Sequence, residues 1–500
     1  MMTPPETTSR RFPSAAWAWP GAELETLLIA AAGADHDHAL AVARDWFARC
    51  DIDESSFREN RLQLAIAARF GKQLADLPEY PRLQGLQRML WTKSRMAIRE
   101  ALPTFERMAA KGIPLMLVKG AARIARDPEA QKARVSHDID LLVPRARGAE
   151  SLRLLNQAGW VPSSGESPAC LRARLDELRS VNLYFGHFGD IDLHMQGYGS
   201  PLPDEHLEAG IWRGATRHDF FGVPVQLPAP EHWLAMTIDS SALDAHTHSD
   251  WLVDCAVLLS GPPLDEALLL ELLERRGLML QAEVAFSFLA ERLGHDVPFL
   301  PELRRRTAAM GRLQRAATLL QAKPRSDWTP LTRHARGVVK QLHLLQIARQ
   351  SRDRRLATPP VLRGSIRKLA PDAPREPRRV TQIDLPCPPA AVSVFRLELA
   401  VPLNGLRRRY DFELNADLGH VQRLRVRDLA GREGTHRLIF SGRLAFERMP
   451  RRLWIEARPG RTLRTADAAE HAQYDAVPFW LLDFRARPLS SRRSAQPAPD

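Results

Sequence analysis

Two aspartates separated by one apolar residue are the best candidates for chemistry in this sequence. Asp138 and Asp140 flank Ile139, and the apolar run 141–143 follows them. On a β-strand, alternate side chains share a face, so both carboxylates should point the same way. Two aligned carboxylates repel each other unless a cation lies between them, and Mg²⁺ prefers oxygen ligands of this kind. The pattern therefore predicts a divalent metal site.

A second strand-like segment further along the chain repeats the pattern. Residues 190–194 read Asp-Ile-Asp-Leu-His, so that Asp192 would add a third carboxylate from a neighbouring strand. Three carboxylates can hold two Mg²⁺ ions, or Mn²⁺ in their place, which bridge a nucleoside triphosphate and an attacking oxygen. We expect Asp138 and Asp140 to hold both metals and Asp192 to help deprotonate the acceptor. Asp190 shares a face with Asp192 and is either a spare ligand or a solvated residue, of which the solvated interpretation is preferred.

Four residues near these carboxylates are candidates for binding phosphate. Lys119 and Gly120 lie at a predicted strand-to-helix turn, where glycine lets the backbone approach a phosphate and the N–H groups of the helix are free. Arg134 could hold a triphosphate through two hydrogen bonds, or could be one more surface arginine. His194 shares a face with Asp192 and could contact phosphate or the acceptor, or simply pack at the strand end.

Two further aspartates follow in a helical segment. Asp250 and Asp254 are one helical turn apart. With His246 and His248 they suggest a metal cluster. No cysteine or further histidine completes a zinc set, so Asp250 and Asp254 are interpreted as capping and polar-face residues.

The periodicity of the sequence predicts the elements that must position these side chains. Apolar residues at i, i+3 and i+4 indicate helices, and short apolar runs between helical segments indicate strands. After residue 390, alternating runs with turn signals indicate an antiparallel β domain of the sandwich type. The predicted parts are a disordered N-terminus (1–20), a helical region (21–110) packing on an α/β unit (111–228), a helical domain (229–350), a linker rich in Pro and Arg (351–389), a β domain (390–486) and a disordered tail (487–500).

Composition limits the class of protein. The chain has 500 residues, a formal net charge of +12 and four cysteines. Arginine supplies most of the positive charge without forming a basic block, so nucleic-acid binding is only weakly supported, and a GC-rich bacterial genome explains the charge equally well. The cysteines form no CxxC pair, which fits a reducing cytoplasm. The sequence contains no signal peptide and no apolar run of the ~20 residues that span a bilayer.

The order of these motifs resembles the uncharacterised nucleotidyltransferase family of the DNA polymerase β-like superfamily. The resemblance implies a polymerase β-like palm, a mixed sheet with flanking helices, and Mg²⁺-dependent transfer of a nucleotidyl group. It also implies that Asp138, Asp140 and Asp192 are the metal carboxylates. Two departures are that Lys119-Gly120 replaces the usual Gly-Ser, and that Asp239 lies where relatives have a histidine. The segments that carry the resemblance are Leu-Val-Lys-Gly-Ala-Ala (117–122), Arg134-x-x-x-Asp138-Ile-Asp-Leu-Leu-Val, Ala-Gly-Trp (158–160), Ile-Asp-Leu-His (191–194) and Trp-Leu-Val-Asp (251–254).

Together the motifs predict a cytoplasmic enzyme that moves an NMP group from an NTP to an acceptor hydroxyl and releases pyrophosphate. The acceptor could be a small molecule, a saccharide, a protein or RNA. Two alternatives remain open: a non-catalytic nucleotide-binding scaffold, and an interaction protein that acts through its C-terminal β domain.

Overall fold

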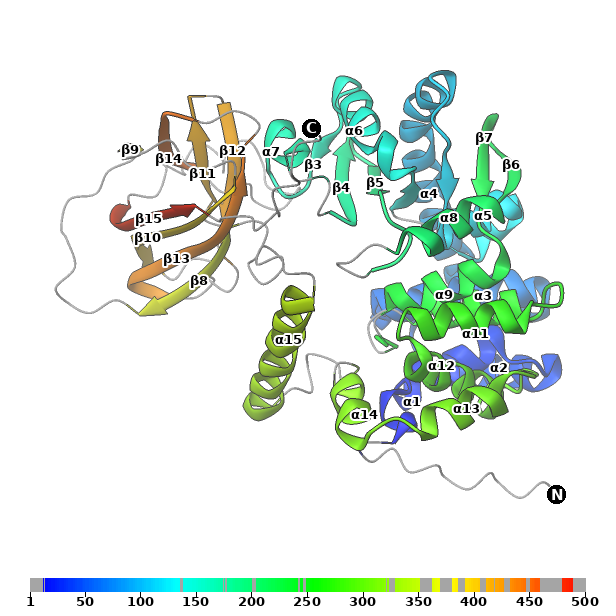
Figure 1. Ribbon diagram of the computed structural model, residues 1–500. Helices are drawn as coiled ribbons and strands as arrows, with labels where there is room; N and C mark the ends of the chain where they lie inside the picture. Colours follow the sequence, from blue (N-terminus) through cyan, green and yellow to red (C-terminus); the bar gives the residue numbers. More distant parts are fainter. Residues whose placement is uncertain are drawn as a thin grey trace, which may run out of the picture. The chain divides into compact units, whose positions relative to one another are not determined.

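The structure is a computed structural model in which two compact units are distinguished (Figure 1). The first unit comprises Met1–Trp160 and Arg179–Lys340, and the second comprises Val161–Leu178 and Gln341–Asp500. The described residues are 12, 14–134, 138–173, 175, 178–199, 204–241, 243–245, 249–320, 322, 329–350, 362–368, 380–384, 392–404, 411–417, 419–426, 432–446, 450–458 and 479–488. Among them, no helix is both long enough and apolar enough to cross a membrane.

A seven-stranded mixed sheet with flanking helices forms the centre of the fold, as predicted. Its strand order is β3-β4-β5-β2-β1-β7-β6. The central pair β2 and β5 is parallel, as is the pair β1 and β7, whereas β1 and β2, β4 and β5, and β6 and β7 are antiparallel. The strands are β1 (Met116–Leu117), β2 (Ile139–Leu142), β3 (Val161–Pro162), β4 (Ser180–Phe185), β5 (Gly189–His194), β6 (Thr216–Phe220) and β7 (Val223–Leu227).

Alternation along the two central strands explains why they lie at the middle of the sheet. Ile139, Leu141, Ile191 and Leu193 are all 0% exposed, so one face of each strand is fully buried. The carboxylates between these apolar residues necessarily point to the other face. The same alternation that buries the apolar side chains on one face of the sheet therefore directs the acidic side chains to the opposite face.

Helices precede and follow the strands of the sheet in the sequence. The longest, α4, contacts β5 and β7, while α5 follows β1 and contacts β1 and β2. The helices of the first unit are α1 (Ala22–Ala32), α2 (His36–Arg49), α3 (Phe57–Phe70), α4 (Tyr80–Ala110), α5 (Lys119–Arg126), α6 (Gly148–Gln157), α8 (Glu205–Arg213), α9 (Pro230–Ser241), α10 (Asp250–Leu259), α11 (Glu266–Arg275), α12 (Met279–Glu291), α13 (Leu300–Ala308) and α14 (Arg312–Leu319); α15 (Pro330–Gln350) runs on into the second unit.

The N-terminal segment is more ordered than predicted. A 3₁₀-helix, Ala15–Ala18, lies within the segment predicted to be disordered. Trp19 is only 4% exposed, donates its indole N–H to the Val284 carbonyl at 3.1 Å and packs edge-on against Phe288. Burial of this large ring stabilises the segment, and composition alone did not reveal it. Residues 1–11 and 13 lie outside the described residues.

The second unit is an antiparallel β-sandwich. One sheet has the order β15-β10-β13-β8 and the other β12-β11-β14-β9. Phe412 of β11 and Phe440 of β13 come from different sheets and have ring centroids 6.4 Å apart, so the two sheets share one core. The strands are β8 (Arg363–Lys368), β9 (Val380–Asp384), β10 (Val392–Asn404), β11 (Asp411–Ala416), β12 (Gly419–Arg425), β13 (Glu433–Ala445), β14 (Arg452–Arg458) and β15 (Trp480–Pro488).

Two predicted boundaries of the β domain need correction. The segment 351–389 is not only a linker, because β8 pairs with β13 and β9 pairs with β14. The segment Val161–Leu178, predicted as part of the α/β unit, groups with the sandwich: Cys170 of α7 (Pro168–Arg172) joins the sandwich core. Of the predicted disordered tail, residues 487–488 end β15, and residues 489–500 lie outside the described residues.

Candidate active site

Four carboxylates form two neighbouring pairs on β2 and β5. The parallel register aligns Asp140 with Asp192 and Ile139 with Ile191. Asp138 and Asp190 come directly before these two isoleucines, so the same register, extended by one residue, brings them side by side. Alternation keeps all four carboxylates on one face of the sheet. Adjacent strands lie about 4.8 Å apart, so the side chains of each pair are neighbours. The sequence-predicted Asp138, Asp140 and Asp192 therefore lie together.

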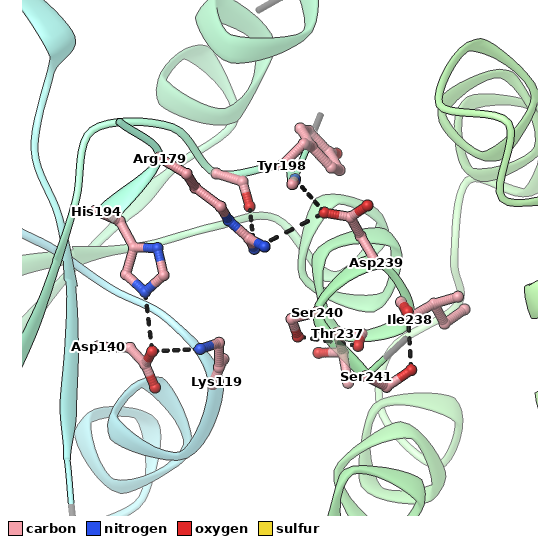
Figure 2. Close-up of polar contacts among 12 residues, drawn as sticks. Lys119, Asp140, Arg179, His194, Tyr198, Thr237, Ile238, Asp239, Ser240 and Ser241 are labelled. Atoms are coloured by element: carbon pink, nitrogen blue, oxygen red, sulfur yellow. Dashed lines mark hydrogen bonds and ion pairs between the residues drawn. The ribbon is translucent and has the colours of Figure 1, made fainter. Parts of the chain in front are cut away.

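His194 and Lys119 contact this group directly (Figure 2). His194 Nε2 lies 2.9 Å from Asp140 Oδ1. The same nitrogen lies 3.0 Å from Asp192 Oδ2. The Lys119 ammonium donates to the same Asp140 oxygen, Oδ1. Asp140 and His194 are each 3% exposed, so these interactions are sheltered from water. Asp140 is thus held between two cationic or polar partners.

The electrostatic environment differs sharply from one carboxyl group to the next. Burial, with help from the Asp140 carboxylate, raises the pKa of Asp138. Burial and the neighbouring Asp138 charge raise the pKa of Asp190 to about 7. Burial acts in the same direction on Asp192, but the hydrogen bond with His194, together with the charges of His194 and Lys119, lowers the pKa of Asp192 to about 2. Mutual repulsion among the carboxylates is therefore only partly relieved by Lys119 and His194.

The donor set fits a divalent cation. Ligand atoms of Asp140, Asp192 and His194 lie within 4.8 Å of one another. In addition, Asp190 Oδ1 and Asp192 Oδ1 are buried and have no hydrogen-bond partner among the described residues. Buried carboxylate oxygens without partners are costly, and a cation would satisfy them. Hard cations such as Mg²⁺ take such oxygens.

The Lys119-Gly120 turn leads from β1 into α5 in an unusual backbone conformation. Lys119 has φ +53°, which is uncommon for a residue with a side chain. Val118 N donates to the Asp140 carbonyl at 3.1 Å, which fixes the turn against β2. A Cβ on Gly120 would lie 3.3 Å from Arg134 Cζ, so the absence of a side chain lets the guanidinium pack on the backbone. Gly120 thus makes room for Arg134 in this structure.

Arg134 lies in a buried ion-pair cluster rather than exposed on the surface. Its Nη1 is 2.6 Å from Asp250 Oδ2 and its Nε is 3.1 Å from Asp254 Oδ2. Arg61 also pairs with Asp250, and Arg123 pairs with Asp254 at 3.1 Å. Asp250 and Asp254 therefore bind arginines, a more specific role than the polar-face interpretation gave them. Although burial opposes it, these two carboxylates, together with the more weakly acting Asp138, raise the pKa of Arg134.

Two further side chains lie near the carboxylates. Asp190 is half-buried, and burial together with the other three aspartates raises its pKa, which agrees better with the spare-ligand interpretation than with the solvated one that was preferred. Arg179 lines a small pocket together with Lys119 and His194, and its Nη2 is 3.8 Å from Asp239 Oδ2 (Figure 2). The alternation that selected Asp192 also includes Asp190. No comparable signal exists for Arg179, which precedes β4.

The mixed sheet gathers carboxylates on adjacent strands, beside a turn that opens a helix, as the resemblance to nucleotidyltransferases predicts. A family model described as "Uncharacterised nucleotidyltransferase" matches residues 58–294 of this chain. The resemblance predicted from the motifs is thereby confirmed over this segment. It contains the whole ion-pair cluster and all four aspartates.

Comparison with individual proteins adds little. A solved structure of the antibiotic-resistance factor ANT(2'')-Ia is similar at 17% identity, with a TM-score of 0.24, covering 43% of this chain and 95% of that chain. No curated protein matches the chain.

Proposed function

We propose that this protein is a divalent metal-dependent nucleotidyltransferase that moves an NMP group from an NTP to an acceptor hydroxyl. The observation that carries the proposal is the register of β2 and β5, which aligns Asp140 with Asp192. The family match over residues 58–294 supports the same class of reaction. A scaffold that only bound nucleotides would have no need for four clustered carboxylates, since their repulsion destabilises the fold.

Asp138, Asp140 and Asp192 would hold Mg²⁺ in this proposal. When bound, the metal would supply charge neutralisation for the phosphates and favour ionisation of the acceptor hydroxyl. Asp192 would receive the hydroxyl proton as the acceptor oxygen bonds to the α-phosphorus. The bond from the α-phosphorus to the bridging oxygen then breaks, and pyrophosphate leaves. His194 would hold Asp140 and Asp192 in place through its hydrogen bonds.

Lys119 and the start of α5 would receive the triphosphate. The first backbone N–H groups of a helix lack partners within the helix and attract anions, and Lys119 adds a full positive charge beside them. Arg134 lies behind Gly120 and is already paired with Asp250 and Asp254. Its contribution would be a positive potential at the turn and support for the backbone of Gly120.

The cytoplasm is the proposed location. Among the described residues no disulfide joins two cysteines, which fits a reducing compartment where nucleoside triphosphates are supplied. The acceptor is a hydroxyl on a small molecule, a saccharide, a protein or an RNA end.

The test is transfer of label from each α-³²P NTP to components of a cell extract in Mg²⁺, followed by the same assay after chelation. We expect Asp138→Asn and Asp192→Asn to lose labelling at least a hundredfold, because each removes a charge from the proposed metal site. Asp45→Asn, at an exposed carboxylate on α2, is the matched control and should label normally. Equal labelling by all variants would exclude this mechanism. Nucleotide binding without labelling by the wild type would favour the scaffold.

A further inference from the structure

A second cavity of the first unit contains none of the proposed catalytic residues. It has a volume of about 690 Å³ and lies among α1, α3, α5 and α10. This volume falls within the range of about 300–1,000 Å³ typical of sites for small molecules. Alanines from different helices leave the space open, among them Ala31, Ala65 and Ala256. The cavity therefore has apolar walls and room for an organic ligand.

The polar lining of this cavity is mainly cationic. Arg69, Arg123 and Arg126 line it together with His295. Arg123 is paired with Asp254, whereas the hydrogen bonds of Arg69 to described residues go to the backbone carbonyls of Ala30 and Gly33, at 3.3 and 2.6 Å. Among the described residues, Arg126 forms no hydrogen bond or ion pair, and its guanidinium lies 5.5 Å from the ring centroid of Trp233. Two arginines at the cavity are thus without a carboxylate partner.

The acidic residues at the rim do not neutralise these arginines. Asp127 Oδ1 accepts a hydrogen bond from Glu129 N at 3.0 Å and caps the following 3₁₀-turn, Pro128–Lys132. Glu129 pairs with Lys132 at 2.6 Å. Burial and the neighbouring Arg123 lower the pKa of Arg126, and the charges of Asp127 and Asp254 oppose this shift without reversing it.

His295 provides a further polar contact of defined character. Its Nε2 lies 2.7 Å from the Ala32 carbonyl, and burial lowers its pKa. A neutral imidazole that donates through Nε2 leaves Nδ1 as an acceptor. The cavity thus offers cations for an anionic group and apolar walls for a carbon skeleton.

From these features we infer that the cavity among α1, α3, α5 and α10 binds a small organic anion, whose phosphate or carboxylate group pairs with Arg126 while its apolar body packs against the alanines. The free guanidinium supplies a strong, charge-assisted hydrogen bond to such a group. The site is separate from the proposed nucleotidyl-transfer centre, and binding there does not depend on that activity.

The test uses the full-length protein and two fluorescent probes of similar shape. One, 8-anilinonaphthalene-1-sulfonate, carries a negative charge, and the other, N-phenyl-1-naphthylamine, is neutral. We expect Arg126→Ala to raise the dissociation constant of the sulfonate at least fivefold and to leave that of the neutral probe unchanged. Ala68→Trp, at an exposed position of the lining, should weaken both probes by blocking the space.

Two controls make the result decisive. Arg153→Ala removes an exposed arginine of α6 outside the cavity and should change neither constant. Arg126→Lys keeps the charge and should retain most of the affinity for the sulfonate. Wild-type affinity for the sulfonate in both Arg126→Ala and Ala68→Trp would overturn the inference, as would an equal loss of both probes in Arg126→Ala. Because no NTP is present, the result is independent of the proposed transfer reaction.

Discussion

Lys119 combines a strained backbone with a charged side chain at the proposed phosphate turn. Its φ of +53° lies in the left-handed region, which costs a residue with a Cβ about 1 kcal/mol relative to glycine. Its ammonium also contacts Asp140. The resemblance implies a glycine-serine pair at the position of Lys119-Gly120. Strain at a site of this kind persists when the side chain is required there. The two properties can be separated by substitution.

Two variants of Lys119 should differ in stability but not in activity. Lys119→Gly and Lys119→Met both remove the ammonium, so both should lose nucleotidyl transfer by at least tenfold. Only glycine relieves the backbone strain, so Lys119→Gly should be more stable than Lys119→Met by about 1 kcal/mol. Urea unfolding monitored by circular dichroism measures the difference, and α-³²P NTP transfer measures activity. Full transfer by either variant would show that the ammonium is not needed.

At the scale of the elements, an ion-pair cluster ties α10 to α3, α5 and the chain before β2. Asp254 pairs with both Arg123 and Arg134, whose side chains are each 11% exposed. Asp250 joins Arg61 to Arg134 in the same way. Since Arg134 packs on Gly120, the cluster also supports the turn that leads to Lys119. Removing one carboxylate leaves buried guanidinium groups without their partner.

Asp254→Asn should therefore destabilise the protein by about 3 kcal/mol, because breaking a buried ion pair leaves an uncompensated charge. Asp45→Asn is the control: its partner Arg49 is one helical turn away, and the two side chains are 67% and 57% exposed. An exposed pair of this kind contributes about 0.5 kcal/mol. Chemical unfolding of the intact protein compares the two. Equal effects would mean that water reaches the Asp254 cluster.

Some features of the fold and of the candidate site could be predicted from the sequence, and others could not. Alternation around Asp138, Asp140 and Asp192 fixes which face of its own strand each side chain takes, so this much could be predicted from strand periodicity. The pairing of Asp138 with Asp190 depends on the register between two strands, which no local pattern encodes. The arginine partners of Asp250 and Asp254 come from distant segments, so helical spacing alone suggested only a polar face.

At the scale of the whole molecule, the chain leaves the first unit after Trp160, joins the second unit and returns at Arg179. Backbone hydrogen bonds join this segment, Val161–Leu178, to β12. Ser167 N donates to the Val421 carbonyl at 3.0 Å, and Arg423 N donates to the Gly165 carbonyl at 3.1 Å. A sequence of mixed polarity between two strands gives no sign of such a partner. The second unit is therefore assembled from a segment between the two aspartate-bearing strands and from the C-terminal part of the chain, and β8 and β9 extend the sandwich into the predicted linker.

Gly165 offers a way to test this assembly in the intact protein. It has φ +73°, and a Cβ there would lie 2.5 Å from the Cβ of Arg423. Gly165→Ala should thus lower the stability of the sandwich by about 2 kcal/mol, combining backbone strain with overpacking. Gly222, between β6 and β7, has φ +91° but nothing within 4 Å of such a Cβ, so Gly222→Ala isolates the strain at about 1 kcal/mol. Differential scanning calorimetry should place the effect of Gly165→Ala on the transition that Phe412→Leu lowers, because Phe412 lies in the sandwich core. If Gly165→Ala instead lowers the transition that Leu141→Ala affects, the excursion belongs to the unit that carries the aspartates.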